Sequence, residues 1–596
     1  MLIFIPRLAP GLDITIQVEI NNIHVSFSPF PFVDQGKIIY LTDIFRKKQR
    51  ILLAHWRAAE NVEIGLHLSY TYPLVSSFSF CKMTFNPQMT SMAQTLLVTA
   101  PAFILYGYNQ AGLSALLKLP NVVHLFPQID TINTDGTQKS TNSTIEGLVN
   151  GCLQLGALAG SLSCSIFGDR LGRRRSIFLA GIISAIGQTI QCTAFSLPQL
   201  IVGRLILGFG IGQLNVTVPV WQAESSNAGS RGRKVITSGI FICVGFFSSS
   251  WINFGCSNMA FAPLQWRIPL VIPVLLSVII CSSVFTFPES PRWLVQVNRP
   301  TEAKKALARL NGINSSDASV DMEISRIQNA LEIAPSSSIK DIFNSSNNCR
   351  LGYRFILCMG IQTLQQLVGG SLISIYTTTI FEDNLHLQGD IPQIIAASSL
   401  TWKFLCSFVA FAAVDRLGRR SLFVISGTGM CFCMVVMAVT NSLPASNQTA
   451  SLISAVTIFV FNFFYPIGFL GGNFLYCAEV APVRLRVAMS SISTANHWLW
   501  NFIIAMVSPV ALASIGWKYY LVFVSTCACV PIIVLPFYPE TMGRNLERID
   551  QVFREAPTIW DIVPMARMIP KGEVATDDAA DGKTTETQVV EHREHA

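Results

Sequence analysis

Two copies of one short arginine-rich turn constrain the fold of this chain more than any other feature. The first copy, GDRLGRRRS, occupies residues 168–176, and the second, VDRLGRRSL, occupies residues 414–422. Each copy is polar and lies between two apolar segments of membrane-spanning length. The second follows the first at an offset of 246 residues, measured from Asp169 to Asp415. The chain therefore contains two related halves.

Two further motif pairs repeat with nearly the same period. Glu224 and Arg231 in the first half return as Glu479 and Arg486 in the second, at an offset of 255 residues. The sequence PESPR at the end of the first half returns as PETMGR at the end of the second, at an offset of 251 residues. Parallel repeats of six membrane spans build one large transporter architecture, so these repeats predict two six-helix halves.

The composition requires contact with lipid. The 596 residues are 51% hydrophobic and only 13% charged, with a mean hydropathy of +0.45, which leaves too few charges to cover a soluble surface. The net charge of +7 does not indicate a nucleic-acid partner, because the arginines lie in short turns between apolar runs. The 15 cysteines are scattered without the spacing of a metal site or a disulfide framework. We expect membrane lipid as a partner, and no metal or cofactor.

From residue 93 onward, apolar stretches long enough to cross the hydrocarbon core recur along the chain. They predict an all-α membrane protein with twelve transmembrane helices. The expected spans are 93–117, 146–167, 176–195, 199–223, 235–255, 267–287, 352–381, 392–413, 421–440, 452–476, 487–512 and 518–538. The expected divisions are an N-terminal extension (1–84), a first half (85–287), a cytoplasmic helical linker (288–351), a second half (352–538) and a C-terminal tail (539–596).

The basic residues of the connections predict the orientation. Both arginine turns lie on one side, together with the basic residues at 231–234 and at 484–486. The opposite loops carry few basic residues and hold the glycosylation sequons at Asn142 and Asn447. By the positive-inside rule the arginine side is cytoplasmic. We expect a multi-pass glycoprotein of the plasma membrane with both termini in the cytoplasm.

Three segments lie outside the expected spans. Residues 1–84 lack an apolar run of spanning length and allow two interpretations. They form a disordered cytoplasmic extension, or they were joined wrongly to a coding sequence that starts near Met83, Met89 or Met92. In the linker, TEAKKALARLNG at 301–312 predicts a short helix that begins at a threonine and ends at a glycine. Beyond Asp550, the acidic residues and small polar residues predict a disordered tail.

Several motifs follow one another in an order that resembles a known family. They are GR at 203–204 followed by Gly208, Gly210 and Gly212, the PxWxxE run that ends at Glu224, RG at 231–232, PESPRWL at 288–294, QQLVGG at 365–370 and PETMGRNLERID at 539–550. Together with the arginine turns, they resemble the sugar porter family of the major facilitator superfamily, and most closely its fungal hexose-type transporters. The resemblance covers residues 90–553. It implies a monomeric, non-enzymatic transporter that moves a sugar or a sugar-like polyhydroxy solute by alternating access.

The resemblance implies a gating role for the charged residues of the arginine side. In family members, equivalent residues form a cytoplasmic network of ion pairs that holds the two halves together in the outward-open state. The corresponding residues are Asp169, Arg173, Glu224 and Arg231 in the first half, and Asp415, Arg419, Glu479 and Arg486 in the second. The alternative is that these charges only fix the topology, although arginine alone would do that without matched acids.

The resemblance also implies a sugar site. Recognition of sugar hydroxyls needs side-chain amides, which both donate and accept, beside an aromatic face. Gln365 and Gln366 match the paired glutamines of the family on the seventh span, and Trp498 matches its tryptophan on the eleventh. Asn501 lies one turn further along the same face. The alternative for the two glutamines is helix packing, but adjacent amides inside a span are costly without polar partners.

Several positions depart from the family pattern. At three of them a hydrogen-bonding position is altered: Gly239 replaces a glutamine, Ser371 replaces an asparagine, and Ile375 with Tyr376 replaces a tyrosine pair. In addition, Phe474 replaces a tryptophan, and His497 stands where asparagine is usual. The expected pocket is therefore less rich in amides than a glucose site, and glucose is not predicted as the solute.

Lys403 is the sharpest departure, because family members carry a sugar-binding asparagine at this place on the eighth span. A lysine at the bilayer centre costs about 2.5–3.5 kcal/mol, so it must face a cavity or a partner. One interpretation is that Lys403 donates to the solute or to an anionic group on it. The alternative is that it reaches a nearby interface or pairs with a carbonyl group.

Asn109 on the first span bears on energy coupling. In proton-driven members this place carries an aspartate that exchanges contacts with the fourth-span arginine, here Arg204. Asparagine cannot titrate, so the resemblance implies facilitated diffusion. Proton symport through a titrating Lys403 stays open as an alternative, and so does a membrane sensor on the same fold. A sensor would be favoured by a long cytoplasmic tail, whereas only 46 residues follow Asp550.

Overall fold

The computed structural model describes residues 17–20, 23–26 and 87–568, with gaps at 132, 135, 227, 260, 262, 334–349, 386–390, 445–446 and 545. The chain divides into two compact units, residues 1–79 and 80–596. In the first unit, strands β1 (Gln17–Ile20) and β2 (Ile23–Ser26) pair antiparallel, with Gln17 opposite Ser26. Most of the N-terminal extension of the sequence prediction lies outside the described residues.

The second unit is helical throughout its described part. Its first half comprises α2 (Pro87–Gln94), the π-helix η1 (Thr95–Thr99), α3 (Ala100–Leu117), α4 (Pro120–Leu125), η2 (Pro127–Ile129), α5 (Gly136–Leu171), α6 (Arg173–Cys192), α7 (Leu197–Glu224), α8 (Ala228–Ser257), α9 (Leu264–Ser283) and η3 (Val284–Thr286). The linker comprises α10 (Pro291–Gln296), α11 (Pro300–Asn311) and α12 (Ala318–Ile333). The second half comprises α13 (Leu351–Leu367), α14 (Gly370–Leu385), α15 (Ile391–Leu417), α16 (Arg419–Ser442), α17 (Gln448–Gly468), α18 (Gly472–Val480), η5 (Val483–Leu485), α19 (Arg486–Ile515) and α20 (Lys518–Phe537). The tail adds α21 (Leu546–Glu555) and α22 (Ile562–Met568).

Each of the expected membrane spans coincides with these helices, which confirms the all-α prediction. By length and apolar composition, nine helical segments within the described residues could cross a membrane. The three other expected spans lie on α3, α6 and α19, which carry buried polar side chains such as Asn109, Gln188 and Asn501. These side chains lower the mean hydropathy of their helices, and they face the protein interior rather than lipid.

The seventh and tenth spans are broken, although the sequence predicted each as one continuous helix. The seventh breaks between α13 and α14, where Gly369 has φ +84°. The tenth breaks between α17 and α18, where Gly471 has φ +95°. Only glycine adopts these left-handed backbone angles readily, so each break is fixed by its glycine. Both glycines lie within apolar runs, and the hydropathy therefore continues across them.

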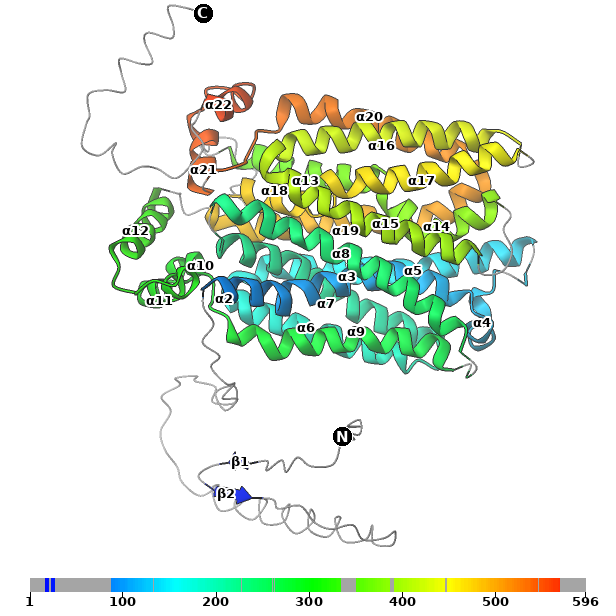
Figure 1. Ribbon diagram of the computed structural model, residues 1–596, viewed down its shortest axis with the longest axis horizontal. Coiled ribbons are helices and arrows are strands. Elements are labelled where there is room, and N and C mark those ends of the chain that lie inside the picture. The colour runs from blue at the N-terminus through cyan, green and yellow to red at the C-terminus, as the bar shows by residue number, and fades with distance from the viewer. Residues whose placement is uncertain are drawn as a thin grey trace, which may run out of the picture. The chain divides into compact units, whose positions relative to one another are not determined.

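The two halves lie side by side, as Figure 1 shows with the first-half helices below and the second-half helices above. Helix α5 packs on α19, and α8 packs on α15, across the boundary between the halves. Helices α10–α12, α21 and α22 lie at one end of the bundle (Figure 1), next to the turns that join α5 to α6 and α15 to α16. We call this the arginine end, and the other the opposite end.

The two arginine turns have the same backbone geometry, which confirms their relationship as repeats. Gly172 in the first turn has φ +82°, and Gly418 in the second has φ +83°. In both turns this glycine immediately precedes the first residue of the next helix, Arg173 of α6 or Arg419 of α16. A side chain at either glycine would be strained.

The linker and the tail differ in part from the sequence prediction. Helix α11 begins at Pro300, one residue before the expected threonine, and ends at Gly312 in the left-handed conformation. The prediction of disorder beyond Asp550 is wrong as far as Met568, because α21 and α22 occupy much of this stretch. Asp550 itself forms an ion pair with Arg354 of α13, so the tail is tied to the second half.

The two sequons differ in exposure. Asn447 is exposed and accepts a hydrogen bond from the backbone N–H of Ala450 at the start of α17. Asn142 is buried in α5, and its side chain donates to the carbonyl of Asp130 at 2.7 Å. In this structure, Asn447 offers its amide to solvent, whereas Asn142 does not.

Candidate functional site

A buried ion-pair cluster holds the arginine end of the first half. The Arg173 guanidinium donates to both carboxylate oxygens of Glu224 at 3.0 Å and to Asp169 Oδ1 at 2.9 Å. Arg173 and Glu224 are almost fully buried. Ser290 Oγ donates to Glu224 Oε2 at 2.7 Å, which satisfies a further lone pair of the carboxylate. A buried ion pair of this kind is favourable only when its remaining polar atoms have partners.

The second half repeats this cluster with equivalent residues. Arg419 donates to the two Glu479 oxygens at 3.1 and 3.3 Å, and to Asp415 Oδ1 at 3.3 Å. Thr541 Oγ1 donates to Glu479 Oε2 at 2.7 Å, in the role that Ser290 has in the first half. The repeated PES and PET sequences therefore complete the two clusters.

Two further carboxylates of these sequences cap helices. Glu289 accepts hydrogen bonds from the backbone N–H groups of Arg173 and Arg174, both at 3.2 Å. Glu540 accepts equivalent bonds from Arg419 at 3.0 Å and Arg420 at 3.1 Å. A carboxylate at a helix N-terminus satisfies free N–H groups and interacts favourably with the helix dipole. Glu289 and Glu540 were not predicted as site residues, although both belong to a repeated motif.

One ion pair of this network joins the two halves. Arg486 of α19 lies 3.7 Å from Glu224 Oε1 of α7, measured from Nη1, and its Nε donates to the Ala478 carbonyl at 3.1 Å. Arg231, its counterpart in the first half, lies in α8, and its side chain lies outside the described residues. Among the described contacts, Arg173 and Arg419 pair with acids of their own halves, while Arg486 and Glu224 pair across the halves.

Close backbone packing also joins the halves at the arginine end. A Cβ atom on Gly232 of α8 would lie 2.3 Å from Arg419 Nη2 and from Asp415 Oδ1. A Cβ atom on Gly168 would lie 2.8 Å from a methyl group of Val487 on α19. The two contacts bring each half against the charged or apolar surface of the other, and an added side chain at either glycine would require its neighbours to shift.

The predicted sugar-binding residues meet in a buried polar cluster beside the break in the seventh span. The Gln366 amide nitrogen lies 3.0 and 3.1 Å from the two ring nitrogens of His497, and its Oε1 accepts from Ser371 Oγ at 2.6 Å. The Asn501 amide donates to the same Ser371 hydroxyl at 3.4 Å. The four side chains are buried. They come from α13, α14 and α19, so helices distant in sequence build one site.

An aromatic wall adjoins this polar cluster. The Trp498 ring packs edge-on against Tyr106 of α3 at 5.2 Å and against His497 at 5.3 Å, measured between ring centroids. Phe474 lies 5.6 Å from His497 and 6.3 Å from Phe103 of α3. Trp498 Nε1 is buried and has no hydrogen-bond partner among the described residues. The wall therefore spans both halves and carries a donor that could bind a hydroxyl group.

Gln365 and Tyr376 lie on two sides of this cluster. The Gln365 amide donates to the Tyr465 hydroxyl at 2.7 Å, while its Oε1 has no partner among the described residues. The Tyr376 hydroxyl donates to the Ala505 carbonyl at 2.7 Å, so α14 is fastened to α19. Tyr106 and Tyr465 were not predicted as site residues, because no motif marks their positions.

Lys403 is completely buried between four helices. Its Nζ donates to Ser374 Oγ of α14 at 2.6 Å and lies 4.6 Å from the ring centroids of Phe246 and Tyr465. The alternative interpretation was that Lys403 reaches a membrane interface or pairs with a carbonyl group. In the structure the ammonium group is buried, and its hydrogen bond goes to the Ser374 hydroxyl. The two rings contribute cation–π attraction, which grows when the cation is desolvated.

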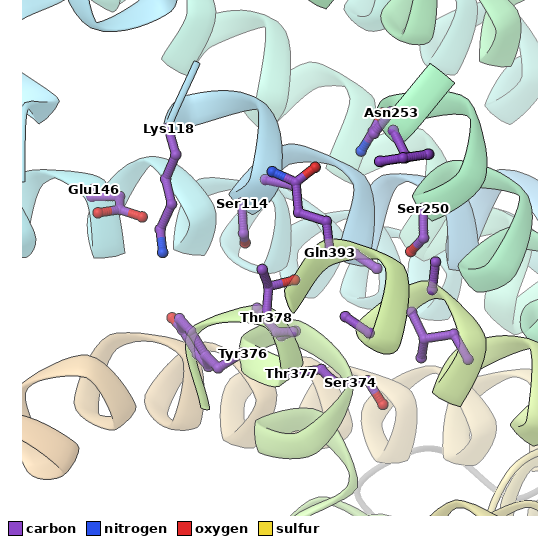
Figure 2. A pocket seen from close by; sticks show the side chains of 17 residues that line it. Ser114, Lys118, Glu146, Ser250, Asn253, Ser374, Tyr376, Thr377, Thr378 and Gln393 are labelled. Atoms are coloured by element: carbon purple, nitrogen blue, oxygen red, sulfur yellow. The ribbon is translucent and has the colours of Figure 1, made fainter. Parts of the chain in front are cut away.

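A cavity of about 60 Å³ lies between the halves, displaced from the cluster toward the opposite end. Figure 2 shows Ser114, Lys118, Glu146, Ser250 and Asn253 on its first-half side. Its second-half side is formed by Ser374, Tyr376, Thr377, Thr378 and Gln393. Typical small-molecule pockets exceed about 300 Å³, so this cavity alone is too small for a sugar. The residues of the buried polar cluster are themselves almost fully buried.

The expected coupling residues are both buried and bonded to backbone carbonyls. The Asn109 amide donates to the Leu105 carbonyl of its own helix at 2.9 Å. Arg204 Nη2 donates to the Asn150 carbonyl at 3.3 Å, and its Nε has no partner among the described residues. The described part of the chain holds no group of three or more His, Cys, Asp or Glu side chains that could bind a metal ion.

This architecture defines a class of membrane protein, namely the two-half helical transporters of the major facilitator fold. The solved structure of the proton:xylose symporter XylE bound to 6-bromo-6-deoxy-D-glucose aligns with 79% of this chain and 100% of its own, with a TM-score of 0.69. Its sequence identity is 19%, so this likeness concerns the fold. A partially occluded inward-open structure of XylE from E. coli aligns with a TM-score of 0.62.

Sequence comparison then gives the family. A family model described as "Sugar (and other) transporter" matches residues 95–553. The sugar transporter STL1 of Saccharomyces cerevisiae is 30% identical over 467 residues, which cover 77% of this chain and 81% of the relative. The high-affinity fructose transporter ght6 of Schizosaccharomyces pombe is 30% identical over 469 residues, which cover 77% of this chain and 86% of the relative. The chain belongs to the sugar transporter family.

Proposed function

We propose that this protein moves a sugar or a related polyhydroxy solute across a membrane by alternating access, with the Gln366 cluster as its binding site. The observation that carries this proposal is the buried set of amide, hydroxyl and aromatic groups where the halves meet. Trp498 Nε1 and Gln365 Oε1, which have no partner in the described part of the chain, add one donor and one acceptor for solute hydroxyls. The curated relatives are transporters by name, which supports a transport role rather than an enzymatic one.

The broken spans provide the moving parts of this cycle. Gln365 and Gln366 end α13, and the break at Gly369 separates them from α14, which carries Ser371 and Ser374. A change at this break can reposition α14 without unfolding α13. The contacts of Arg486 and Gly232 close the arginine end in the present structure. Access from the opposite end then requires α14 to separate from the first half.

The arginine end is the cytoplasmic end in this proposal, and both termini lie in the cytoplasm of a plasma-membrane protein. The support is the concentration of arginines at this end. Transport is facilitative, because the place of a proton-carrying aspartate holds Asn109, whose amide is bonded to its own helix. The protein acts as a monomer and needs no cofactor.

The test is uptake in a transporter-null cell across a panel of hexoses, pentoses, disaccharides, polyols and sugar acids. We expect saturable uptake of at least one polyhydroxy solute. Gln366→Ala should weaken the apparent affinity about tenfold or more, since a lost buried hydrogen bond costs roughly 1–3 kcal/mol. Normal delivery to the membrane with no uptake of any panel member would contradict the proposal and favour a sensor.

A further inference from the structure

Lys403 is a buried cation without a carboxylate among its described contacts. Its partners are the Ser374 hydroxyl and the rings of Phe246 and Tyr465. Its side chain is 0% exposed. Lys403 lies 12 residues from the first residue of α15 and 14 from the last, which places it near the middle of a helix long and apolar enough to span a membrane. An ammonium there costs about 2.5–3.5 kcal/mol on insertion scales, so its retention calls for a function.

The acids of the described bundle lie elsewhere. Asp169, Glu224, Asp415 and Glu479 are held by arginines at the arginine end. Glu146 accepts a hydrogen bond from Thr131 and faces the same cavity as Lys118, near the start of α5 (Figure 2). The space around Lys403 therefore keeps a positive charge that the described side chains do not neutralise, and such a space attracts anions.

The contacts of Lys403 connect it to both the cavity and the sugar site. Ser374, its hydrogen-bond acceptor, lines the cavity between the halves. Tyr465, one of its two rings, accepts the hydrogen bond from Gln365 through its hydroxyl at 2.7 Å. A solute held by Gln365 would therefore lie one side chain away from the ammonium group.

The bond from Lys403 to Ser374 is one that a carboxylate can replace. A serine hydroxyl is a neutral acceptor, whereas an ammonium–carboxylate hydrogen bond is charge-assisted and roughly twice as strong. A carboxylate entering from the cavity side meets Ser374 first. Exchange of acceptors would also release α14 from α15, because Ser374 and Lys403 join these two helices.

We propose that the solute is a polyhydroxy acid, whose carboxylate binds Lys403 Nζ in place of Ser374 while its hydroxyls bind Gln365, Gln366 and Trp498. This inference rests on the proposed transport function and narrows its substrate class. It accounts for two departures from the family pattern. Lys403 adds a cation in place of one asparagine, and Ser371 removes the amide of another. A neutral sugar would form the same hydroxyl contacts, but the Lys403 ammonium group would stay bonded to Ser374.

The test uses the purified full-length protein in liposomes and compares matched pairs, D-galactose with D-galacturonate and D-glucose with D-glucuronate. We expect the wild-type protein to transport at least one acid with a kcat/KM about tenfold or more above that of its neutral partner. Lys403→Asn should remove this preference, and Lys403→Arg should retain most of it. Lys518→Asn, at an exposed lysine that begins α20, is the matched control and should keep the preference.

The outcomes separate this inference from the proposed function. Transport of neutral sugars with exclusion of both acids would overturn the inference and leave the proposed function intact. Transport of neither neutral sugars nor acids would overturn both. If Lys403→Asn fails to fold, the wild-type pair comparison still decides, and Ser374→Ala should preserve or strengthen the acid preference. Loss of that preference in Ser374→Ala would contradict the exchange of acceptors.

Discussion

Gln365 and Gln366 form the last turn of α13, and both use part of their hydrogen-bonding capacity on the protein itself. Gln366 is bonded to Ser371 and lies against His497, while Gln365 donates to Tyr465. A solute must therefore compete with these contacts or use the atoms they leave free. This arrangement explains how adjacent amides are stable inside the protein, and it leaves Gln365 Oε1 available for the proposed recognition of a solute.

The first prediction concerns these two amides. Gln365→Ala and Gln366→Ala should each weaken apparent solute affinity about tenfold or more, since unmatched buried hydroxyls cost roughly 1–3 kcal/mol. Asn496→Ala is the matched control, because this amide on α19 is bonded to Thr363 and to the Met359 carbonyl. Concentration-dependent uptake measures the affinities. Unchanged affinity in both glutamine variants would assign them to helix packing.

The second prediction concerns Arg173 and Arg419. Removing one partner of a buried ion pair costs about 3–5 kcal/mol, so Arg173→Ala and Arg419→Ala should lower the transport rate about tenfold or more. The ranking of solutes should stay the same, and membrane insertion should persist. Arg175→Ala, at an exposed arginine of the same turn, provides the control. Rates equal to the wild type in both variants would leave these arginines with a topological role only.

At the scale of single residues, the sequence predicted those residues of the candidate site that lie in or near family motifs. It did not predict the residues that lie outside such motifs. Gln366, Ser371 and Asn501 do meet in one cluster, as their motif positions implied. Tyr465 and Tyr106 were missed because their roles depend on which helix faces touch across the bundle. Lys403 could be singled out because a charged side chain inside a membrane span costs free energy. Its partner Ser374 lies 29 residues earlier, and no motif in the sequence marks it.

Among the helices, α8 contributes directly to the contact between the halves at the arginine end. Gly232 brings its backbone against Asp415 and Arg419 of the other half. Gly232, which follows the repeated arginine position of the first half, therefore belongs with the charged residues in the proposed gate. We expect this role to be steric, since an added side chain would displace the buried side chains of Arg419 and Asp415 or move the backbone of α8.

The third prediction concerns this contact. In Gly232→Ala, the added methyl group would meet Arg419 and Asp415 at 2.3 Å. Overpacking costs about 1–3 kcal/mol, which shifts the conformational equilibrium about tenfold toward states that are open at the arginine end. Hydrogen exchange of the purified protein should therefore speed up at the arginine ends of α8 and α15. Gly255→Ala on the same helix is the control, because its Cβ meets nothing within 4 Å. Equal exchange in the two variants would contradict the steric role.

The positions of most helices followed from the sequence, but the two breaks did not. Spanning segments are visible as apolar runs because lipid contact requires them. The breaks at Gly369 and Gly471 depend on backbone angles, and glycine is also common in unbroken membrane helices. The tail was misjudged for a related reason. Helix α21 is short and strongly polar, yet it buries Ile549, Val552 and Phe553 against the bundle.

The molecule as a whole is two related halves around a buried site, and its energy source depends on whether that site carries protons. The fourth prediction is that uptake is not concentrative and that a protonophore leaves its initial rate unchanged. The reason is that Asn109 cannot titrate and Arg204 is bonded to a backbone carbonyl. Asn109→Asp should introduce a pH dependence. Concentrative uptake that a protonophore abolishes, together with solute-dependent proton influx, would show symport by another route.

The repeat was the most informative part of the sequence at this scale. Its two arginine turns predicted two halves, and Gly172 and Gly418 show that the turns share one backbone conformation. The contacts between the halves could not be predicted in the same way. They join α5 to α19 and α8 to α15, which are far apart in sequence and have no shared motif.

The central claim is that one buried site is exposed alternately to the two sides of the membrane, and solute counterflow tests it most directly. Liposomes that contain the purified full-length protein are loaded with unlabelled solute, and the entry of labelled solute is followed over time. We predict a transient accumulation of label above its equilibrium level and a saturable initial rate, both reduced in Gln366→Ala. Label that enters no faster into loaded than into empty liposomes, at a rate that rises linearly with concentration, would contradict alternating access.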